Sequence, residues 1–267
     1  MRIYVLDGAG THGRHDNSVI AGGVDRLERT LTRKHDPDTT AEWVPWQAAL
    51  MGVGGNRESW ENNSREGVRL LVERMQSHDE DVILIAYSAG NKPAHDFLND
   101  HPEFHDRVAA VGFVSDPWRP RDRWQHGLGD PGGWGVCGED WTPIPARCFW
   151  TAVPGDVIPC AQPDSLLRYA ADVSGGDPDR IVHDMIEAAT RGRFQLARFL
   201  GLPLHEWLVG LGRRLHEARM AVEGYLWLGH HTKHYVGPVN TGGGDLRSLL
   251  DRLMDSIAWG VAHTKEE

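Results

Sequence analysis

Cysteine is scarce in this chain of 267 residues, and the three present are Cys137, Cys148 and Cys160. No two of them are spaced as Cys-x-x-Cys. So sparse and odd a set excludes a scaffold built on disulfides. We expect free thiols, and if a single bridge forms, Cys148 and Cys160 are its more plausible partners.

Long apolar runs and clusters of basic residues are absent as well. Because no stretch of about eighteen apolar residues occurs, we expect no integral membrane segment. The opening residues MRIYVLDGAG have the pattern of a strand and lack the basic and apolar regions of a secretion signal, so we expect no signal peptide. The formal net charge is −10, with 38 acidic and 28 basic residues, which argues against a nucleic-acid partner.

What the sequence does contain is a pattern of short apolar runs that alternate with helical spacings. Such alternation predicts a parallel sheet whose crossover connections are helices. The length and the 40% of hydrophobic residues suffice for one α/β domain over residues 1–267. The expected strands cover residues 1–7, 43–46, 81–86, 108–114 and 146–153.

Two segments depart from this alternation. Residues 117–145 are rich in Trp, Gly and Pro and predict a long irregular loop, a feature that is often functional. Its tryptophans form either an apolar lip for an acyl chain or packing against the core. Residues 164–228 contain helical spacings but no convincing strand, and we interpret them as a helical insertion before the last element of the site.

The sharpest local motif is Ile85-Ala86-Tyr87-Ser88-Ala89-Gly90, which follows a continuous apolar strand and precedes a helix. A nucleophile elbow needs small residues two positions before and after its serine, and Ala86 and Gly90 meet that need. We therefore predict that Ser88 is a nucleophile. The N–H of Ala89, and that of Ala9 in the glycine-rich turn after the first strand, are the predicted oxyanion donors.

A serine hydroxyl needs a base, and that base needs an orienting acid, which in α/β-hydrolases follow in the order Ser, Asp or Glu, His. Asp156 lies just after the strand expected at 146–153, in Val153-Pro154-Gly155-Asp156, and is the preferred acid. Asp116, at the end of the preceding strand, is the second candidate. The base should lie in the segment 229–235, where His231 is preferred, then His234, then His230.

Two other interpretations use some of the same residues. The three histidines could bind zinc, but no cysteine lies near them in the sequence and no His-Glu-x-x-His motif occurs, so we expect no metal. Gly8, Gly10 and Gly13 complete a Gly-x-Gly-x-x-Gly pattern that is typical of dinucleotide sites. Four polar residues separate those glycines from the next helical pattern, and we expect no cofactor.

The order and spacing of these motifs resemble the mycobacteriophage lysin B family, relatives of cutinase. The resemblance rests on the opening strand and glycine turn, Tyr87-Ser88-Ala89-Gly90, the pair Gly155-Asp156, the helical insertion and the final histidine segment with Tyr235. It also includes Ser115-Asp116-Pro117-Trp118-Arg119, where family members typically have G-N-P-M-R. At the elbow the family typically has G-Y-S-Q-G, so Ala86 and Ala89 depart from it.

The resemblance implies a cutinase-like α/β-hydrolase that cleaves the ester joining mycolic acids to arabinogalactan in the envelope of Actinobacteria. It implies a role in phage lysis, with synthesis in the host cytoplasm and release through a membrane opened by a holin. The partner would be a lipid or acyl ester. A bacterial lipase or cutinase-like esterase acting on another ester, and a non-catalytic binding module, remain the alternatives.

Overall fold

The computed structural model describes most of the chain outside the segment expected to be inserted. The described residues are 1–11, 13–48, 60–125, 127–165, 167–168, 213, 216–217, 220, 223–239 and 246–263. The predicted insertion at 164–228 therefore lies almost entirely outside them, and it stays a prediction together with the single domain over 1–267. Within the described part, no helix is long and apolar enough to cross a membrane.

A five-stranded, all-parallel sheet is the centre of the structure, with strand order β2-β1-β3-β4-β5. This confirms the predicted α/β class with a parallel sheet. The strands are Arg2–Leu6 (β1), Thr40–Trp43 (β2), Val82–Tyr87 (β3), Val108–Val114 (β4) and Cys148–Thr151 (β5).

The second strand was predicted at 43–46 and actually ends at Trp43. Pro45 has no N–H to give to a ladder, so strand pairing stops before it. The apolar residues Val44 and Trp46, which suggested the strand, are nevertheless buried. Val44 N–H still donates to Val5 O at 2.9 Å, so the chain continues along β1 beyond the formal end of the strand.

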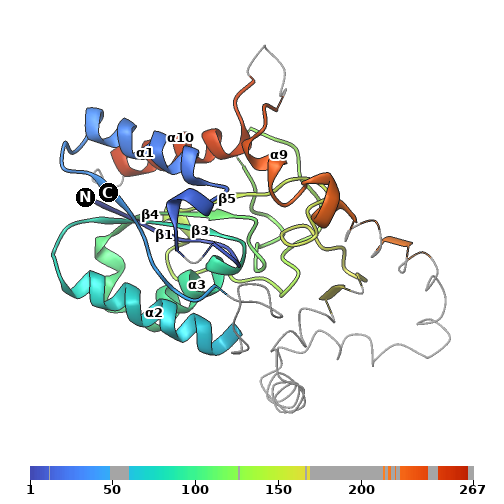
Figure 1. Ribbon diagram of the computed structural model, residues 1–267, viewed down its shortest axis with the longest axis horizontal. Coiled ribbons are helices and arrows are strands. Elements are labelled where there is room, and N and C mark those ends of the chain that lie inside the picture. Colours follow the sequence, from blue (N-terminus) through green and yellow to red (C-terminus); the bar gives the residue numbers. More distant parts are fainter. Residues whose placement is uncertain are drawn as a thin grey trace.

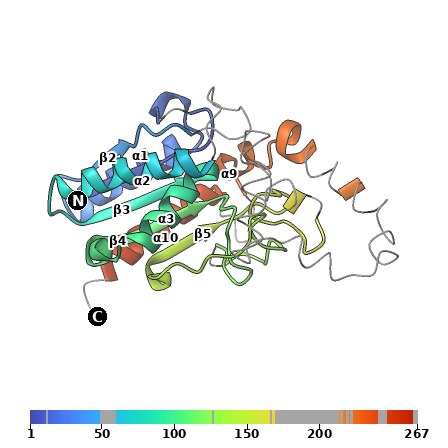
Figure 2. The same ribbon diagram turned by 90° about the horizontal axis from the view of Figure 1, so that it is seen from below.

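Helices cover both faces of the sheet. Figures 1 and 2 show α1 and α10 on one face and α2 and α3 on the other. The helices are Ala21–Lys34 (α1), Trp60–Gln76 (α2), Asn91–Asp100 (α3), Lys233–Val236 (α9) and Leu249–His263 (α10), and short 3₁₀ turns occur at His15–Asn17, Ser88–Gly90, Pro102–Arg107 and Pro145–Arg147.

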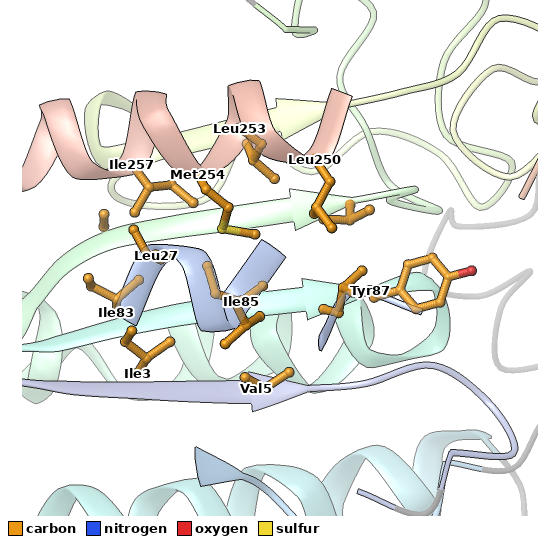
Figure 3. Close-up of a cluster of buried hydrophobic side chains, with 14 of the residues drawn as sticks. Ile3, Val5, Leu27, Ile83, Ile85, Tyr87, Leu250, Leu253, Met254 and Ile257 are labelled. Atoms are coloured by element: carbon orange, nitrogen blue, oxygen red, sulfur yellow. The ribbon is translucent and has the colours of Figure 1, made fainter. Parts of the chain in front are cut away.

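The alternation of side chains along β3 divides the core between the two faces. Ile83, Ile85 and Tyr87 belong to the cluster that meets α1 and α10, which Figure 3 shows. Val82, Leu84 and Ala86 belong to the cluster under α2 and α3. All six side chains are buried, as expected of a central parallel strand with both faces covered.

The strand order fixes where a site can form. β1 is flanked by β2 on one side and by β3 on the other, so successive crossovers leave β1 and β3 in opposite directions across the sheet. Open α/β sheets bind ligands outside the carboxyl ends of the strands at such a switch point. Here the turn after β1 and the turn after β3 meet there, at the side of the molecule where α9 lies (Figure 1).

Candidate active site

The turn after β3 has the strand–turn–helix geometry of a nucleophile elbow. Ser88 has φ +53°, in the left-handed region that residues other than glycine rarely adopt. It begins a 3₁₀ turn that leads into α3. Glycine is required at position 90, because a Cβ there would lie 1.9 Å from the carbonyl oxygen of Leu6 on β1. The elbow is therefore pressed against the neighbouring strand.

Three side chains from distant parts of the sequence form a line at this elbow. His231 Nε2 lies 2.8 Å from Ser88 Oγ, and His231 Nδ1 lies 3.1 Å from Oδ2 and 3.3 Å from Oδ1 of Asp156. All three residues are buried, with Ser88 retaining 9% exposure. With Nδ1 facing a carboxylate, the neutral imidazole carries its proton there and leaves Nε2 to accept the serine proton.

Asp156 is fully buried, yet its carboxylate is held in the ionised form. Burial alone would raise its pKa, but the charge and hydrogen bond of His231 and the hydroxyls of Ser115 and Tyr235 outweigh burial and lower the pKa below its usual value. Ser115 Oγ donates to Oδ2 at 2.7 Å and Tyr235 OH at 2.9 Å. The Ile158 N–H donates to Oδ1 at 3.1 Å.

Two tyrosine rings flank the imidazole of His231. The Tyr87 ring stacks against it at 5.3 Å between centroids, and the Tyr225 ring lies at 4.4 Å. The Tyr87 hydroxyl also donates to the His231 carbonyl oxygen. Aromatic faces attract a cation, so this environment favours the imidazolium that would form during a reaction. Neither tyrosine was singled out from the sequence as a neighbour of the base.

The other two histidines of the segment do not reach Ser88. His234 was predicted as an alternative base, and in the structure its side chain is exposed on the short helix α9, while Tyr235 beside it is buried. The ring of His230 lies 4.9 Å from that of His234, and its Nδ1 faces the carbonyl oxygen of Gly155. Among the described residues, no three His, Cys, Asp or Glu side chains gather as metal ligands would.

Asp116, the second candidate for the acid, has a different set of partners. Its Oδ2 lies 3.0 Å from His95 Nε2 and accepts the Trp150 indole N–H at 2.9 Å, while Oδ1 accepts the Trp118 backbone N–H. Burial would lower the pKa of His95, but Asp116 and Asp140 raise it to about 9. This buried pair joins α3 to the residues that follow β4 and does not contact His231.

The predicted oxyanion donors come from two turns, the elbow itself and the turn after β1. Ala89 follows Ser88 at the start of the helix, where N–H groups lack intrahelical acceptors. In the turn after β1, Gly8 N–H donates to Asp7 Oδ1 and Gly10 N–H to Ala48 O, which leaves the Ala9 N–H without an acceptor among the described residues. A Cβ on Gly8 would lie 3.2 Å from Ser88 Cβ, so this turn directly abuts the elbow.

The same turn bears on the dinucleotide alternative. Gly8, Gly10 and Gly13 do not open a helix, because a 3₁₀ turn at His15–Asn17 intervenes and α1 begins only at Ala21. A pyrophosphate site needs the glycine turn to lead straight into the helix N-terminus. The geometry here serves contact with the elbow instead.

The irregular loop at 117–145 is organised around a buried arginine. Arg119 is fully buried, and its guanidinium donates to five backbone carbonyl oxygens, among them those of Pro159 and Gly133. The guanidinium groups of Arg121 and Arg168 both lie over the ring of Trp134, at 4.6 and 4.2 Å from its centroid. Trp118 contacts the rings of Trp60 and His95, so it and Trp134 are partly buried against the protein, whereas Trp141 is 42% exposed. The three cysteines are free thiols.

A groove of about 740 Å³ lies near the site and is lined in part by Val153 and Pro154, which precede Asp156 in the chain. Trp124, Leu128, Val153, His234 and Leu249 are among the residues that line it. Ser88, Asp156 and His231 are not among them. The groove is thus separate from the line of side chains at the elbow.

Comparisons with known proteins identify similar structures but no similar sequences. No family model matches the chain, and no curated protein matches it. It is similar to the solved structure of lysin B from Mycobacteriophage D29, with 16% identity, a TM-score of 0.49, and coverage of 83% of this chain and 88% of the other.

Two further solved structures are similar at comparable levels. A cutinase-like protein from Cryptococcus sp. has 13% identity and a TM-score of 0.45, with coverage of 60% of this chain and 78% of the other. An acetyl xylan esterase has 15% identity and a TM-score of 0.45, with coverage of 75% and 98%. The likeness is one of fold.

The site was partly predictable from the sequence. The structure brings together Ser88, Asp156 and His231, and the turn that contains Ala9 approaches Ser88 through Gly8. Ser115 was overlooked, although it directly follows a buried strand at the same edge of the sheet. The signal that could have identified it is the one that identified Asp116, namely a polar residue at the carboxyl end of a parallel strand.

Proposed function

We propose that the protein is a serine esterase in which Ser88, His231 and Asp156 act as nucleophile, base and orienting acid. The observation that carries the proposal is the 2.8 Å contact between Ser88 Oγ and His231 Nε2, with the Asp156 carboxylate behind the imidazole. In the proposed reaction Ser88 Oγ attacks the ester carbonyl carbon as His231 Nε2 takes its proton. The N–H groups of Ala89 and Ala9 hold the oxyanion.

The acyl-enzyme is then formed and hydrolysed by the same groups. His231 gives its proton to the leaving alcohol as the carbon–oxygen bond of the ester breaks, which leaves the acyl group on Ser88. Water, deprotonated by His231, attacks that acyl group and restores the free serine. Asp156 stabilises the imidazolium at both stages, and the reaction needs no metal or cofactor.

We propose a lipid ester as the substrate, specifically the ester between mycolic acid and arabinogalactan, cleaved during phage lysis. The resemblance of the sequence motifs to the lysin B family supports this assignment. Apolar side chains exposed just before and after His231 in the chain are consistent with a lipid, since Trp227 is 72%, Leu228 54% and Val236 46% exposed. The enzyme would reach the envelope from the host cytoplasm after a holin opens the membrane.

The substrate is tested with purified cell envelope from an actinobacterium. We expect the wild-type protein to release free mycolic acids, measured by thin-layer chromatography, and also to hydrolyse a short-chain nitrophenyl ester. The Ser88→Ala protein is the control for both assays. Hydrolysis of the nitrophenyl ester without release of mycolic acid would contradict the substrate and favour a lipase or cutinase-like esterase. Failure in both assays would favour a non-catalytic binding module.

The role of Asp156 is tested by Asp156→Asn. We expect kcat to fall about 10⁴-fold, because an amide that offers its NH₂ group to His231 favours the wrong tautomer of the imidazole. Asp116→Asn is the matched comparison, since Asp116 contacts His95 and not His231. It should lower the melting temperature and leave kcat of the folded protein near the wild-type value. A large loss of kcat in Asp116→Asn with little in Asp156→Asn would reverse the assignment.

A further inference from the structure

Ser115 has a backbone conformation that is unfavourable for every residue except glycine. It directly follows Val114, the last residue of β4, with φ +49°, and it is fully buried. Its N–H donates to the Thr151 carbonyl oxygen on β5, which fixes the backbone there. Glycine adopts this φ freely, and strained residues of this kind concentrate at functional sites. The hydroxyl of Ser115 is therefore present at a conformational cost.

That hydroxyl lies between the imidazole and the carboxylate. Ser115 Oγ donates to Asp156 Oδ2 at 2.7 Å and lies 3.0 Å from His231 Nδ1. The carboxylate oxygens themselves are 3.1 Å and 3.3 Å from that nitrogen. The Nδ1–H of His231 thus lies at least as close to Ser115 Oγ as to either carboxylate oxygen of Asp156.

Asp156 Oδ2 is crowded with donors. Ser115, Tyr235 and His231 all approach this one oxygen, at 2.7, 2.9 and 3.1 Å, and the imidazole is the most distant of the three. A carboxylate oxygen has two lone-pair sites, so three donors must share them. The second oxygen already accepts the Ile158 N–H at 3.1 Å. The carboxylate therefore holds the imidazole less firmly than a dedicated partner would.

We propose that Ser115 is a positioning residue, which holds the His231 imidazole jointly with Asp156. Its oxygen accepts the Nδ1–H of His231 while its own O–H donates to the carboxylate, so the hydroxyl bridges the two groups and fixes the tautomer that leaves Nε2 free for Ser88. The inference rests on the proposed function and adds a fourth residue to the three named there.

Tyr235 provides a matched control for this role. Its hydroxyl donates to the same Oδ2 atom as Ser115, but it contacts the Val153 N–H and not the imidazole of His231. If Ser115 serves only to solvate the buried carboxylate, removal of either hydroxyl should have the same effect. If it also holds the imidazole, removal of Ser115 should cost more.

The test compares Ser115→Gly with Tyr235→Phe. Glycine removes the hydroxyl and suits φ +49°, so Ser115→Gly should fold with an unchanged or raised melting temperature. We expect Ser115→Gly to lower kcat about 10- to 100-fold with little change in KM, and Tyr235→Phe to lower kcat less than about fivefold. Ser115→Ala should match Ser115→Gly in kcat while losing thermal stability.

Proton NMR gives a readout that does not depend on turnover. The Nδ1–H of His231 should produce a downfield resonance in the wild-type protein, which is assigned by its loss in His231→Gln. It should shift or broaden in Ser115→Gly and persist in Tyr235→Phe. Equal losses of kcat in the two variants, or an unchanged resonance and kcat in Ser115→Gly, would overturn the role of Ser115. An inactive wild-type protein would instead count against the proposed function, and the resonance would still test the bridge.

Discussion

Replacing Ser88 by alanine is expected to reduce kcat for ester hydrolysis by about 10⁵- to 10⁶-fold. Loss of a serine nucleophile lowers kcat by about this factor in other serine hydrolases. The reason is that alanine has no oxygen to form the acyl-enzyme, while the backbone donors and the substrate site remain. Ser88 is buried with 9% exposure, but alanine differs from serine by a single oxygen, so the variant should keep a melting temperature near the wild-type value.

Ser77→Ala is the control for this variant. Ser77 directly follows α2, is exposed, and donates its hydroxyl to the carbonyl oxygen of Arg74. Its kcat should equal that of the wild-type protein in the same nitrophenyl ester assay. Residual activity above a few per cent in Ser88→Ala, with the preparation shown to be free of wild-type enzyme, would mean that another group attacks the ester.

Replacing His231 by glutamine is expected to lower kcat by about 10⁵-fold, because the serine then has no base within reach. Glutamine approximates the reach of the imidazole and can still donate toward Asp156, so the surrounding structure should hold. His234→Gln is the matched control only three residues away, since His234 is exposed on α9 and its ring lies against that of His230. Its kcat should stay within about twofold of the wild-type value, as for most exposed substitutions.

The histidine pair is measured by steady-state kinetics on one ester at one pH, with melting temperatures for each protein. The expected pattern is a nearly complete loss in His231→Gln and none in His234→Gln. The opposite pattern would show that the segment rearranges when substrate binds. Equal, moderate losses in both would mean that neither histidine is the base.

The residue at the elbow could be predicted from the sequence because its determinants are local. A buried strand, a small residue at position 86 and glycine at position 90 constrain one turn within six residues, and steric contact with Leu6 O explains the glycine. The strands themselves follow from continuous apolar runs. Where a run contained Pro45, the ladder ended early, since proline cannot donate to it.

The choice among the three histidines could not be made from spacing. Gly229 adopts φ +77° and starts a new turn, and the burial of Tyr235 then sets which side chains of that turn face inward. These are tertiary effects. Likewise, Asp116 and Asp156 both follow strands, and only packing with His95 and Trp150 assigns Asp116 elsewhere. The position of Ser115 after a strand marks it as a candidate, but its contacts with Asp156 and His231 join segments far apart in the sequence, so its role could not be predicted.

The role of Ser88 as the nucleophile is tested most directly by covalent labelling with a fluorophosphonate probe, followed by mass spectrometry of the peptides. The proposed arrangement predicts that the phosphonate is found on the peptide containing Ser88, and that labelling is lost in Ser88→Ala and strongly slowed in His231→Gln. A wild-type protein that takes up no probe, or one that carries it on a different serine, would contradict the assignment of Ser88 as an activated nucleophile.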